Sequence, residues 1–291
     1  MNYRLSRIAA ICGGKFSGCD SEVRSVVTDS RSLSCELGCR PMFVAMRGAN
    51  HDSHDFIADM QSRGVRAFLV EQGVEASSCT GECGFVQVDN AIEALQRLAA
   101  YHRAQFRGTV VGITGSNGKT VIKEWIAEEL PEGMKYYRSP KSYNSQLGVP
   151  LSVLMLEGDE ELAIFEAGIS KPGEMERLER IIRPDAVIFT SIGDAHQENF
   201  INLEQKCDEK MILARSASKI IYHSYYEPLG RMVAAHFADR RPVDAASYPE
   251  VPESVIGNAA SRRNAQIVEA FCAAMHYPAP SFASAPTVPM R

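Results

Sequence analysis

The sequence predicts an α/β fold, in which a small N-terminal α/β domain precedes a larger, doubly wound domain with a mostly parallel sheet. Short apolar runs rich in β-branched residues alternate with amphipathic stretches, which is typical of strands alternating with helices. The alternation becomes stronger after Thr109, and a glycine-rich turn there joins a strand to a helix. The length of 291 residues, 45% of them apolar, suits about two domains.

The first predicted domain covers residues 1–106. Its expected strands are short apolar runs, with helices between them, at residues 26–28, 42–46, 67–70 and 85–88. Its last element is an expected helix over residues 91–106, which carries Leu95 and Leu98 at helical spacing. Arg107 and Gly108 follow as a hinge, so we place the domain boundary there.

The second predicted domain covers residues 107–291. Its expected buried strands occupy residues 109–114, 162–166, 185–190 and 219–223. Its expected helices occupy residues 121–130, 174–182, 203–214 and 262–275. Residues 237–255 lack periodicity and predict a loop, and the Pro-, Ala- and Ser-rich stretch 278–289 resembles a linker. The order of elements is that of a doubly wound domain.

The charge balance excludes some function classes. Lys and Arg number 31 against 36 Asp and Glu, for a formal charge of −5, whereas a nucleic-acid binder should have a basic face. No run approaches the about 18 apolar residues of a membrane-spanning helix, so no membrane insertion is expected. The apolar patch at residues 8–11 is too short for a signal peptide. We therefore expect a soluble, cytoplasmic protein.

The eight cysteines suit the same compartment. The pairs Cys35/Cys39 and Cys79/Cys83 are spaced C-x3-C, which is not the C-x2-C spacing of a zinc ribbon. Reduced thiols are favoured over structural zinc in a chain without an export signal.

The strongest chemical signal is the turn after the expected strand 109–114. It consists of Gly115, Ser116, Asn117, Gly118, Lys119 and Thr120. Glycines let successive N–H groups converge on phosphate oxygens at a helix N-terminus, where Lys119 would reach the β- and γ-phosphates and Thr120 would bind Mg²⁺. The spacing is Gly-x-x-Gly-Lys-Thr, shorter than the standard phosphate loop. The alternative is a glycine-rich turn with an incidental surface lysine.

The segment T-G-S-N-G-K-T resembles the ATP loop of the Mur ligases, the amide-forming synthetases of peptidoglycan precursor assembly, and of their folylpolyglutamate synthetase relatives. Further matches follow in order and are most similar to the D-alanyl-D-alanine-adding members, at residues 141–151, 166–168, 172–175 and 193–196. Residues 28–31, 43–48 and 54–56 resemble the family's UDP-binding domain. The resemblance covers nearly the whole chain.

This resemblance implies an N-terminal UDP-binding domain, a central ATP-binding domain and a ligase of cell wall synthesis. ATP would phosphorylate the terminal carboxylate of UDP-N-acetylmuramoyl-tripeptide, and the amine of D-alanyl-D-alanine would attack the acyl phosphate. It implies Mg²⁺ as cofactor, held by Thr120, Glu166 and His196. From the residues alone, Glu166 and His196 each follow or end an expected strand and so belong at the carboxyl edge of the sheet.

The resemblance also implies a lysine that CO₂ converts to a carbamate near the metals. The matching position is Lys210, and Lys206, one turn earlier, is the rival. Carbamylation needs a neutral amine, so this lysine must be desolvated or lie near cations. An ordinary solvated lysine is the alternative in so charged a segment. With Lys119 and His196, Lys210 would be catalytic.

Three further assignments come from the resemblance. Asn264 would face adenine, although Ala260 and Ser261 stand where the family has His-Asn. Ser30 and Arg31 would contact the uridine diphosphate, which suits a guanidinium fork, and an exposed turn arginine is the alternative. Asn144 would contact the substrate. We expect no metal at His51, Asp52, His54 and Asp55, because aspartate there suits a helix cap.

Family members carry a third, C-terminal domain that closes over ATP, and this sequence stops at Arg291, where that domain would begin. We therefore expect the chain alone to bind ligands weakly and to turn over little or not at all. The missing domain would be fused or encoded separately. The alternatives are a non-catalytic UDP-sugar and ATP-binding module, a ligase of the folylpolyglutamate type, or a phosphate-loop kinase or ATPase, for which no acidic catalytic loop is visible.

Overall fold

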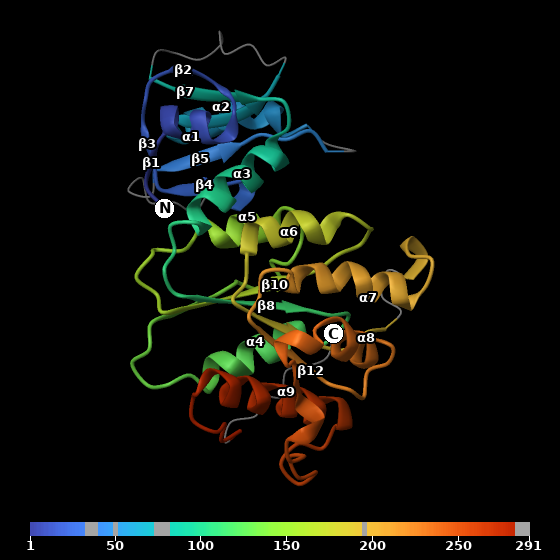
Figure 1. Ribbon diagram of the computed structural model, residues 1–291. Helices are drawn as coiled ribbons and strands as arrows, with labels where there is room; N and C mark the ends of the chain where they lie inside the picture. The colour runs from blue at the N-terminus through green and yellow to red at the C-terminus, as the bar shows by residue number, and fades with distance from the viewer. Residues whose placement is uncertain (33–39, 49–51, 73–81, 194–196, 283–291) are drawn as a thin grey trace. The chain divides into compact units, whose positions relative to one another are not determined.

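The computed structural model describes residues 1–32, 40–48, 52–72, 82–193 and 197–282. Its contacts divide the chain into two units (Figure 1): Met1–Phe106 with Pro150–Glu157, and Arg107–Val149 with Gly158–Arg291. Residues 150–157 thus group with the first unit, away from the rest of the range 107–291. In that unit His102 Nε2 lies 3.0 Å from the carbonyl oxygen of Leu156.

The first unit contains a mixed five-stranded sheet. Its strands, in spatial order, are β2 (Lys15–Gly18), β7 (Gly84–Val88), β6 (Ala67–Glu71), β5 (Pro41–Val44) and β4 (Ser25–Val27). All neighbours pair in parallel except β2 and β7. A separate antiparallel pair joins β1 (Tyr3–Arg4) to β3 (Glu22–Val23). The four strands expected in this part of the sequence are confirmed.

Helices α1 (Leu5–Cys12), α2 (Ile57–Ser62) and α3 (Ala91–Arg103) complete this unit, with short 3₁₀ turns at Ser30–Ser32 and Ser53–Phe56. α3 begins where the side chain of Asn90 accepts a hydrogen bond from the backbone N–H of Glu93, as a helix cap does. The expected cap at residue 52 is confirmed, because Asp52 accepts from the backbone N–H of His54.

The second unit contains a six-stranded sheet in which every pair is parallel. Its spatial order is β13 (Val243–Asp244), β12 (Lys219–Tyr222), β11 (Ala186–Phe189), β8 (Thr109–Thr114), β10 (Leu162–Ala167) and β9 (Tyr136–Arg138). The carboxyl ends of parallel strands meet at one edge, where the switch of strand order places binding sites in this kind of sheet.

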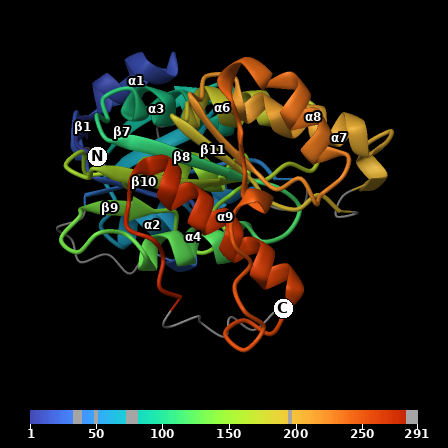
Figure 2. The same cartoon turned by 60° about the horizontal axis from the view of Figure 1, so that its bottom comes forward.

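Helices cover both faces of this sheet. α4 (Lys119–Glu128) and α9 (Ala259–Met275) lie on one face, and α6 (Glu174–Ile182) and α7 (Leu203–Met211) lie on the other (Figures 1 and 2). α8 (Leu229–His236) contacts α7, and the short α5 spans Gly148–Val153. No helix within the described ranges combines the length and the apolar character needed to cross a membrane.

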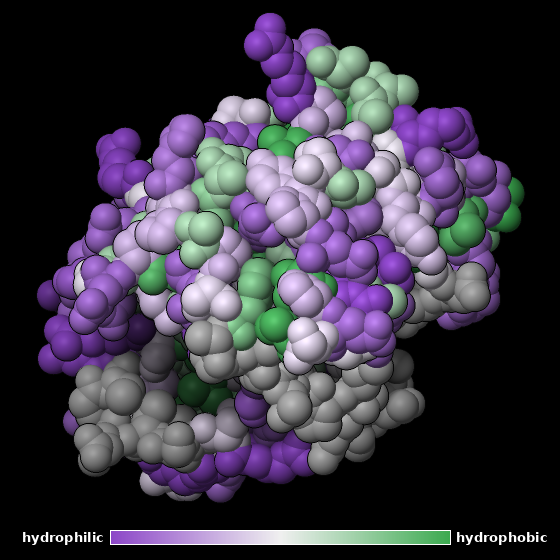
Figure 3. Space-filling model, turned by 90° about the horizontal axis from the view of Figure 1, so that it is seen from below, coloured by the Kyte–Doolittle hydropathy of each residue, from purple (hydrophilic) through white to green (hydrophobic). Residues whose placement is uncertain are grey.

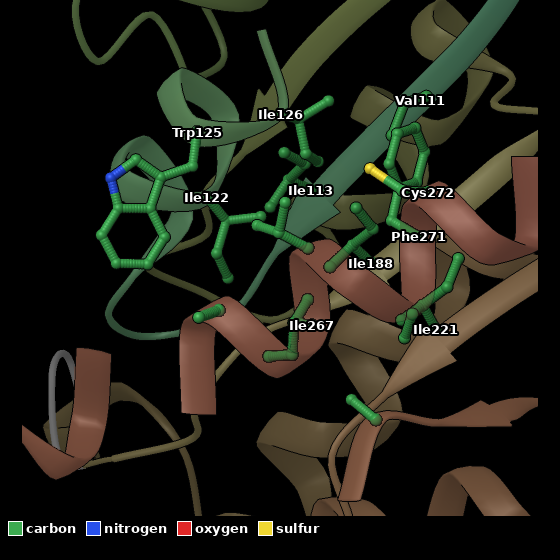
Figure 4. Close-up of a cluster of buried hydrophobic side chains, with 14 of the residues drawn as sticks. Val111, Ile113, Ile122, Trp125, Ile126, Ile188, Ile221, Ile267, Phe271 and Cys272 are labelled. Atoms are coloured by element: carbon green, nitrogen blue, oxygen red, sulfur yellow. The ribbon is translucent and has the colours of Figure 1, made fainter. Parts of the chain in front are cut away.

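The core between the sheet and the first pair of helices is continuous. Val111, Ile113, Ile188 and Ile221 from the strands meet apolar side chains of α4 and α9 (Figure 4). These strand residues are fully buried, as expected for a sheet covered on both faces. By contrast, the face in Figure 3 is largely hydrophilic, with hydrophobic side chains in small separate groups.

Two short edge strands differ from the sequence prediction. Residues 237–255, expected to form a loop, contain β13 and a 3₁₀ turn at Ala245–Ser247, so that expectation is wrong in part. β9 was not expected either. Strands of two or three residues are too short to show an alternating pattern, and neighbouring strands β12 and β10 supply their hydrogen bonds. Of the linker-like stretch, residues 283–289 lie outside the described residues.

Candidate functional site

The glycine-rich turn lies between β8 and α4, at the carboxyl edge of the sheet, which confirms its predicted context of strand, turn and helix. Gly118 precedes α4 in a left-handed conformation, with φ at 88°. Gly115 has φ at 151°, and a Cβ atom added there would lie 1.8 Å from Oγ1 of Thr190. Glycine is therefore required at position 115 by both backbone angle and space.

The loop after β11 holds this turn in place. The backbone N–H of Ser116 donates to the carbonyl oxygen of Ser191 at 2.7 Å, and Thr190 Oγ1 donates to the carbonyl oxygen of Asn117 at 2.6 Å. The backbone N–H of Gly193 donates to Oγ of Ser116 at 3.0 Å. The turn is thus fixed in front of the N-terminus of α4, where the helix dipole favours an anion.

The side chain of Lys119 folds over the turn. Its Nζ donates to the carbonyl oxygens of Gly115 at 2.8 Å and Ser116 at 3.2 Å. Burial lowers the pKa of Lys119, and the neighbouring Glu166 carboxylate acts in the opposite direction. Lys119 is therefore not an incidental surface lysine, because its ammonium group lies against the turn it was predicted to serve.

Glu166 brings a fully buried carboxylate to the same place. In β10 it shares a face with Leu162 and Ile164, which pack in the core beside α4, because alternate residues of a strand point the same way. Oγ1 of Thr120 donates to Glu166 Oε2 at 3.1 Å, and Nδ2 of Asn144 lies 3.5 Å from the same oxygen. The structure thus brings together three side chains that the sequence assigned to the site.

Lys123 is part of this cluster and was missed by the sequence analysis. Its Nζ lies 2.8 Å from Glu166 Oε1, and both side chains have 0% exposure. The same nitrogen donates to the carbonyl oxygens of Ser139 at 2.7 Å and Lys141 at 2.6 Å. The available signal was its place one turn after Lys119 on the helix face that also carries Ile122 and Ile126, since a lysine on a buried helix face needs a partner.

Lys206 and Lys210 of α7 are both buried, so the alternative of an ordinary solvated lysine does not describe either of them. Nζ of Lys210 lies 3.3 Å from the carbonyl oxygen of Gly115, whereas Nζ of Lys206 donates to the carbonyl oxygen of Gly193 at 2.6 Å. Burial, with the charges of Lys119 and Lys206, lowers the pKa of Lys210 to about 7.

The side-chain amide of Asn264 in α9 lies against Gly118 of the turn. A Cβ atom added at Gly118 would lie 3.1 Å from its Oδ1. The preceding Arg263 places its guanidinium carbon 3.9 Å from the ring centroid of Tyr225, which follows β12. His196, the remaining predicted metal ligand, lies outside the described residues.

Ser30 and Arg31 belong to the first unit. The guanidinium group of Arg31 donates to both carboxylate oxygens of Asp29, at 3.0 and 2.9 Å, and these hydrogen bonds lower the pKa of Asp29 to about 2. The Arg31 side chain is 89% exposed. The backbone carbonyl of Ser30 accepts from Arg63 at 2.6 Å. In this structure Arg31 is an exposed turn arginine, which is one of the two interpretations that the sequence allowed.

The oxygen atoms of Thr120 and Glu166 are of the kind that Mg²⁺ prefers, and they are adjacent at the phosphate turn. Within the described ranges, no group of three or more His, Cys, Asp or Glu residues is placed to hold a metal. A magnesium ion here would therefore complete its shell with water and phosphate oxygens, as it usually does in nucleotide sites.

Comparisons with known proteins agree with this geometry. The family "Mur ligase middle domain" matches residues 113–247. A UDP-N-acetylmuramoyl-tripeptide–D-alanyl-D-alanine ligase from Borreliella burgdorferi is 34% identical over 206 residues, which cover 67% of this chain and 44% of that protein. The protein of the same name from Bacillus subtilis is 31% identical over 189 residues, covering 65% and 40%. Both matches span less than half of the relative.

Solved structures show the same fold. MurF from Acinetobacter baumannii has a TM-score of 0.82 at 21% identity, covering 98% of this chain and 68% of that one. MurF ligase from Thermotoga maritima, solved in complex with ADP, has a TM-score of 0.74 at 22% identity, covering 88% and 64%. The family match shows that residues 113–247 correspond to a Mur ligase middle domain, and the chain as a whole resembles D-alanyl-D-alanine-adding Mur ligases in sequence and in fold.

Proposed function

We propose that this chain supplies the UDP-substrate-binding and ATP-binding parts of a ligase that adds D-alanyl-D-alanine to UDP-N-acetylmuramoyl-tripeptide in the cytoplasm. The observation that carries the proposal is the convergence of Lys119, Thr120 and Glu166 at one phosphate-binding turn. The relatives named above carry this activity in their names, and the chain matches part of their length.

In this proposal the turn from Gly115 to Thr120 binds the phosphates of ATP. The carbonyl oxygens that now accept from Lys119 are neutral, so a phosphate oxygen with its charge would compete for the ammonium group. Lys119 would then neutralise the γ-phosphoryl group during its transfer to the substrate carboxylate. Because two negatively charged reactants must meet, charge neutralisation is the largest contribution such a site can make.

Thr120 and Glu166 would hold Mg²⁺ through Oγ1 and Oε2, and His196 would be a further ligand. The ion would supply Lewis-acid polarisation of the phosphoryl oxygens. Glu166 suits this role because it is buried yet keeps Oε2 directed at a hydroxyl group of the phosphate turn. Asn144, which faces the same oxygen, would contact the acceptor carboxylate.

Lys210 is the residue we propose for carbamylation. A pKa of about 7 leaves a large share of its amine neutral at physiological pH, which is the form that reacts with CO₂. It also lies against Gly115, within the phosphate turn itself. Lys206 is the weaker candidate, because its Nζ is engaged by the carbonyl oxygen of Gly193 at 2.6 Å.

Asn264 would contact adenine, because its amide lies against Gly118 of the turn. In the first unit, Ser30 and Arg31 would contact the uridine diphosphate. The Arg31 fork already binds a carboxylate in the bidentate manner that also suits phosphate, and it is exposed to an incoming ligand.

The acyl-phosphate step tests this proposal without requiring the second substrate. Chain, Mg²⁺, ATP and UDP-N-acetylmuramoyl-tripeptide are mixed with hydroxylamine, which converts an acyl phosphate to a hydroxamate. Because the chain alone is expected to turn over little, we expect hydroxamate to accumulate slowly, only when both ATP and the tripeptide are present, and none with Lys119→Ala. ATP hydrolysis that ignores the tripeptide would favour a kinase or ATPase. UDP-ligand binding without any ATP binding would favour a non-catalytic module.

A further inference from the structure

Lys123 stands out among the buried charges of the second unit because it joins three separate segments. It belongs to α4, its carboxylate partner Glu166 belongs to β10, and its two carbonyl partners, Ser139 and Lys141, belong to the segment after β9. Its Nζ donates to the two carbonyl oxygens at 2.7 and 2.6 Å, and it forms ion pairs with Glu166 Oε1 at 2.8 Å and with Glu124 Oε1 of its own helix at 3.4 Å.

The segment after β9 carries Asn144. It is anchored at its start, where the backbone N–H of Ser139 donates to the carbonyl oxygen of Ile164, and at Asn144, whose carbonyl oxygen accepts from Gly168. Between these anchors Lys141 has a positive φ of 49°, an uncommon angle for a residue with a side chain. Its carbonyl oxygen accepts the shorter of the two Lys123 hydrogen bonds, at 2.6 Å.

The two carboxylate oxygens of Glu166 therefore have different partners. Oε1 meets Lys123, whereas Oε2 meets Thr120 and Asn144. A carboxylate can rotate about its terminal bond, so a fixed cation on one oxygen decides which way the other points. Groups that orient a metal ligand commonly change metal affinity by about 10- to 100-fold when removed.

We propose that Lys123 is a positioning residue for magnesium and nucleotide binding, and this inference rests on the function proposed above. By holding Glu166 Oε1 and the carbonyls of Ser139 and Lys141 together, it directs Oε2 toward Thr120 and keeps Asn144 beside it. Lys123 itself does not touch the nucleotide. Its contribution acts through Glu166, so it should affect nucleotide affinity only when Mg²⁺ is present.

The test compares binding of the non-hydrolysable ATP analogue AMP-PNP with Mg²⁺ and with EDTA, by calorimetry on the 291-residue chain. We define the magnesium gain as the dissociation constant in EDTA divided by the dissociation constant with Mg²⁺. Lys123→Met removes the ammonium group. Lys123→Arg keeps a charge beside Glu166 but replaces the compact donor set by a planar fork, so it preserves the ion pair without the geometry. Lys135→Met is the control, because Lys135 forms an exposed ion pair with Asp159.

We expect both Lys123 variants to lose about tenfold or more of the magnesium gain, with affinity in EDTA close to that of the unsubstituted chain. Lys135→Met should change neither value. A full magnesium gain in Lys123→Arg overturns the proposal, and this variant decides alone if circular dichroism shows that Lys123→Met does not fold. Equal losses with and without Mg²⁺ indicate a merely structural role and also overturn it.

Failure of the underlying function looks different. If the unsubstituted chain binds AMP-PNP in neither condition, the proposed function fails and this inference fails with it. If the unsubstituted chain shows a magnesium gain that both Lys123 variants retain, only the role of Lys123 is rejected.

Discussion

The ammonium nitrogen of Lys210 lies 3.3 Å from the carbonyl oxygen of Gly115, which places an amine with a pKa of about 7 against the phosphate turn. In the unfolded chain a lysine has a pKa above 10. Between pH 7 and 10 the unfolded chain therefore binds more protons than the folded one. The free energy of unfolding should rise with pH in this window.

Lys210→Met should reduce this rise. The slope contributed by one such group is at most about 1.4 kcal/mol per pH unit. Urea unfolding at pH 7, 8 and 9 measures it, with Lys135→Met as an exposed control whose slope should match that of the unsubstituted chain. Identical slopes for the Lys210→Met variant and the unsubstituted chain would show that Lys210 keeps an ordinary pKa.

Lys119→Ala should weaken AMP-PNP binding by about 10- to 100-fold, since a hydrogen bond to a charged group is worth about 1.5–3 kcal/mol. The substitution should change the free energy of unfolding little. In the folded chain the ammonium group of Lys119 exchanges hydrogen bonds to water for hydrogen bonds to two neutral carbonyl oxygens, and burial disfavours its charge, as its lowered pKa shows. Calorimetric titration and thermal unfolding measure the two effects. Unchanged AMP-PNP affinity would remove Lys119 from the phosphate site.

Gly115→Ala should distort the turn, because its Cβ would lie 1.8 Å from Thr190 Oγ1. Gly158→Ala is the matched control: Gly158 also has a positive φ, at 98°, but a Cβ there meets nothing within 4 Å. The control should cost about 1–2 kcal/mol of backbone strain, and Gly115→Ala more, with loss of AMP-PNP binding. Equal losses of unfolding free energy in the two variants would argue against the close contact.

Lys123 and Glu166 should show strong energetic coupling. Lys123→Met leaves the buried Glu166 carboxylate uncompensated and should cost about 3–5 kcal/mol of unfolding free energy. Glu166→Met should cost somewhat less, because Lys123 keeps Glu124 Oε1 at 3.4 Å. The double variant should cost far less than the sum, because no charge is left unpaired. Urea unfolding of the four proteins measures the cycle. Additive effects would mean that the two side chains do not pair in solution.

Arg31→Ala should leave the unfolding free energy within about 0.5 kcal/mol, because exposed ion pairs contribute little. It should nevertheless weaken binding of UDP to the chain if Arg31 meets the diphosphate. Arg24→Ala, which removes another surface ion pair of the same unit, is the control. A UDP affinity that responds equally to both substitutions, or to neither, would count against a specific role for Arg31.

Much of the fold could be predicted from periodicity. The expected strand 109–114 and helix 174–182 coincide with β8 and α6, because both are long enough to show a pattern and are bounded by turn residues. In α6 the bounding residues Gly173 and Arg183 both have positive φ. The edge strands β9 and β13 were not predicted, because a strand this short forms by pairing with the neighbouring strand and has no recognisable pattern of its own.

The site could be predicted only where its residues adjoin a motif. Lys119 and Thr120 follow directly from the phosphate turn, and Glu166 from the end of a strand. Lys123 could not be assigned, because the sequence does not show that its partners are Glu166 and two backbone carbonyls from another segment. Similarly, the sequence suggests that the guanidinium group of Arg31 binds phosphate. In the structure this group donates to the carboxylate of Asp29, which would compete with a phosphate.

The most direct test of the central claim is a crystal structure of the chain with AMP-PNP and Mn²⁺, which replaces Mg²⁺ and is located by its anomalous scattering. The account predicts the triphosphate in the turn from Gly115 to Thr120, with the ion contacting Thr120 Oγ1 and Glu166 Oε2 while Lys123 remains on Oε1. A nucleotide bound elsewhere, or an ion in the turn without contact to Glu166, would contradict it.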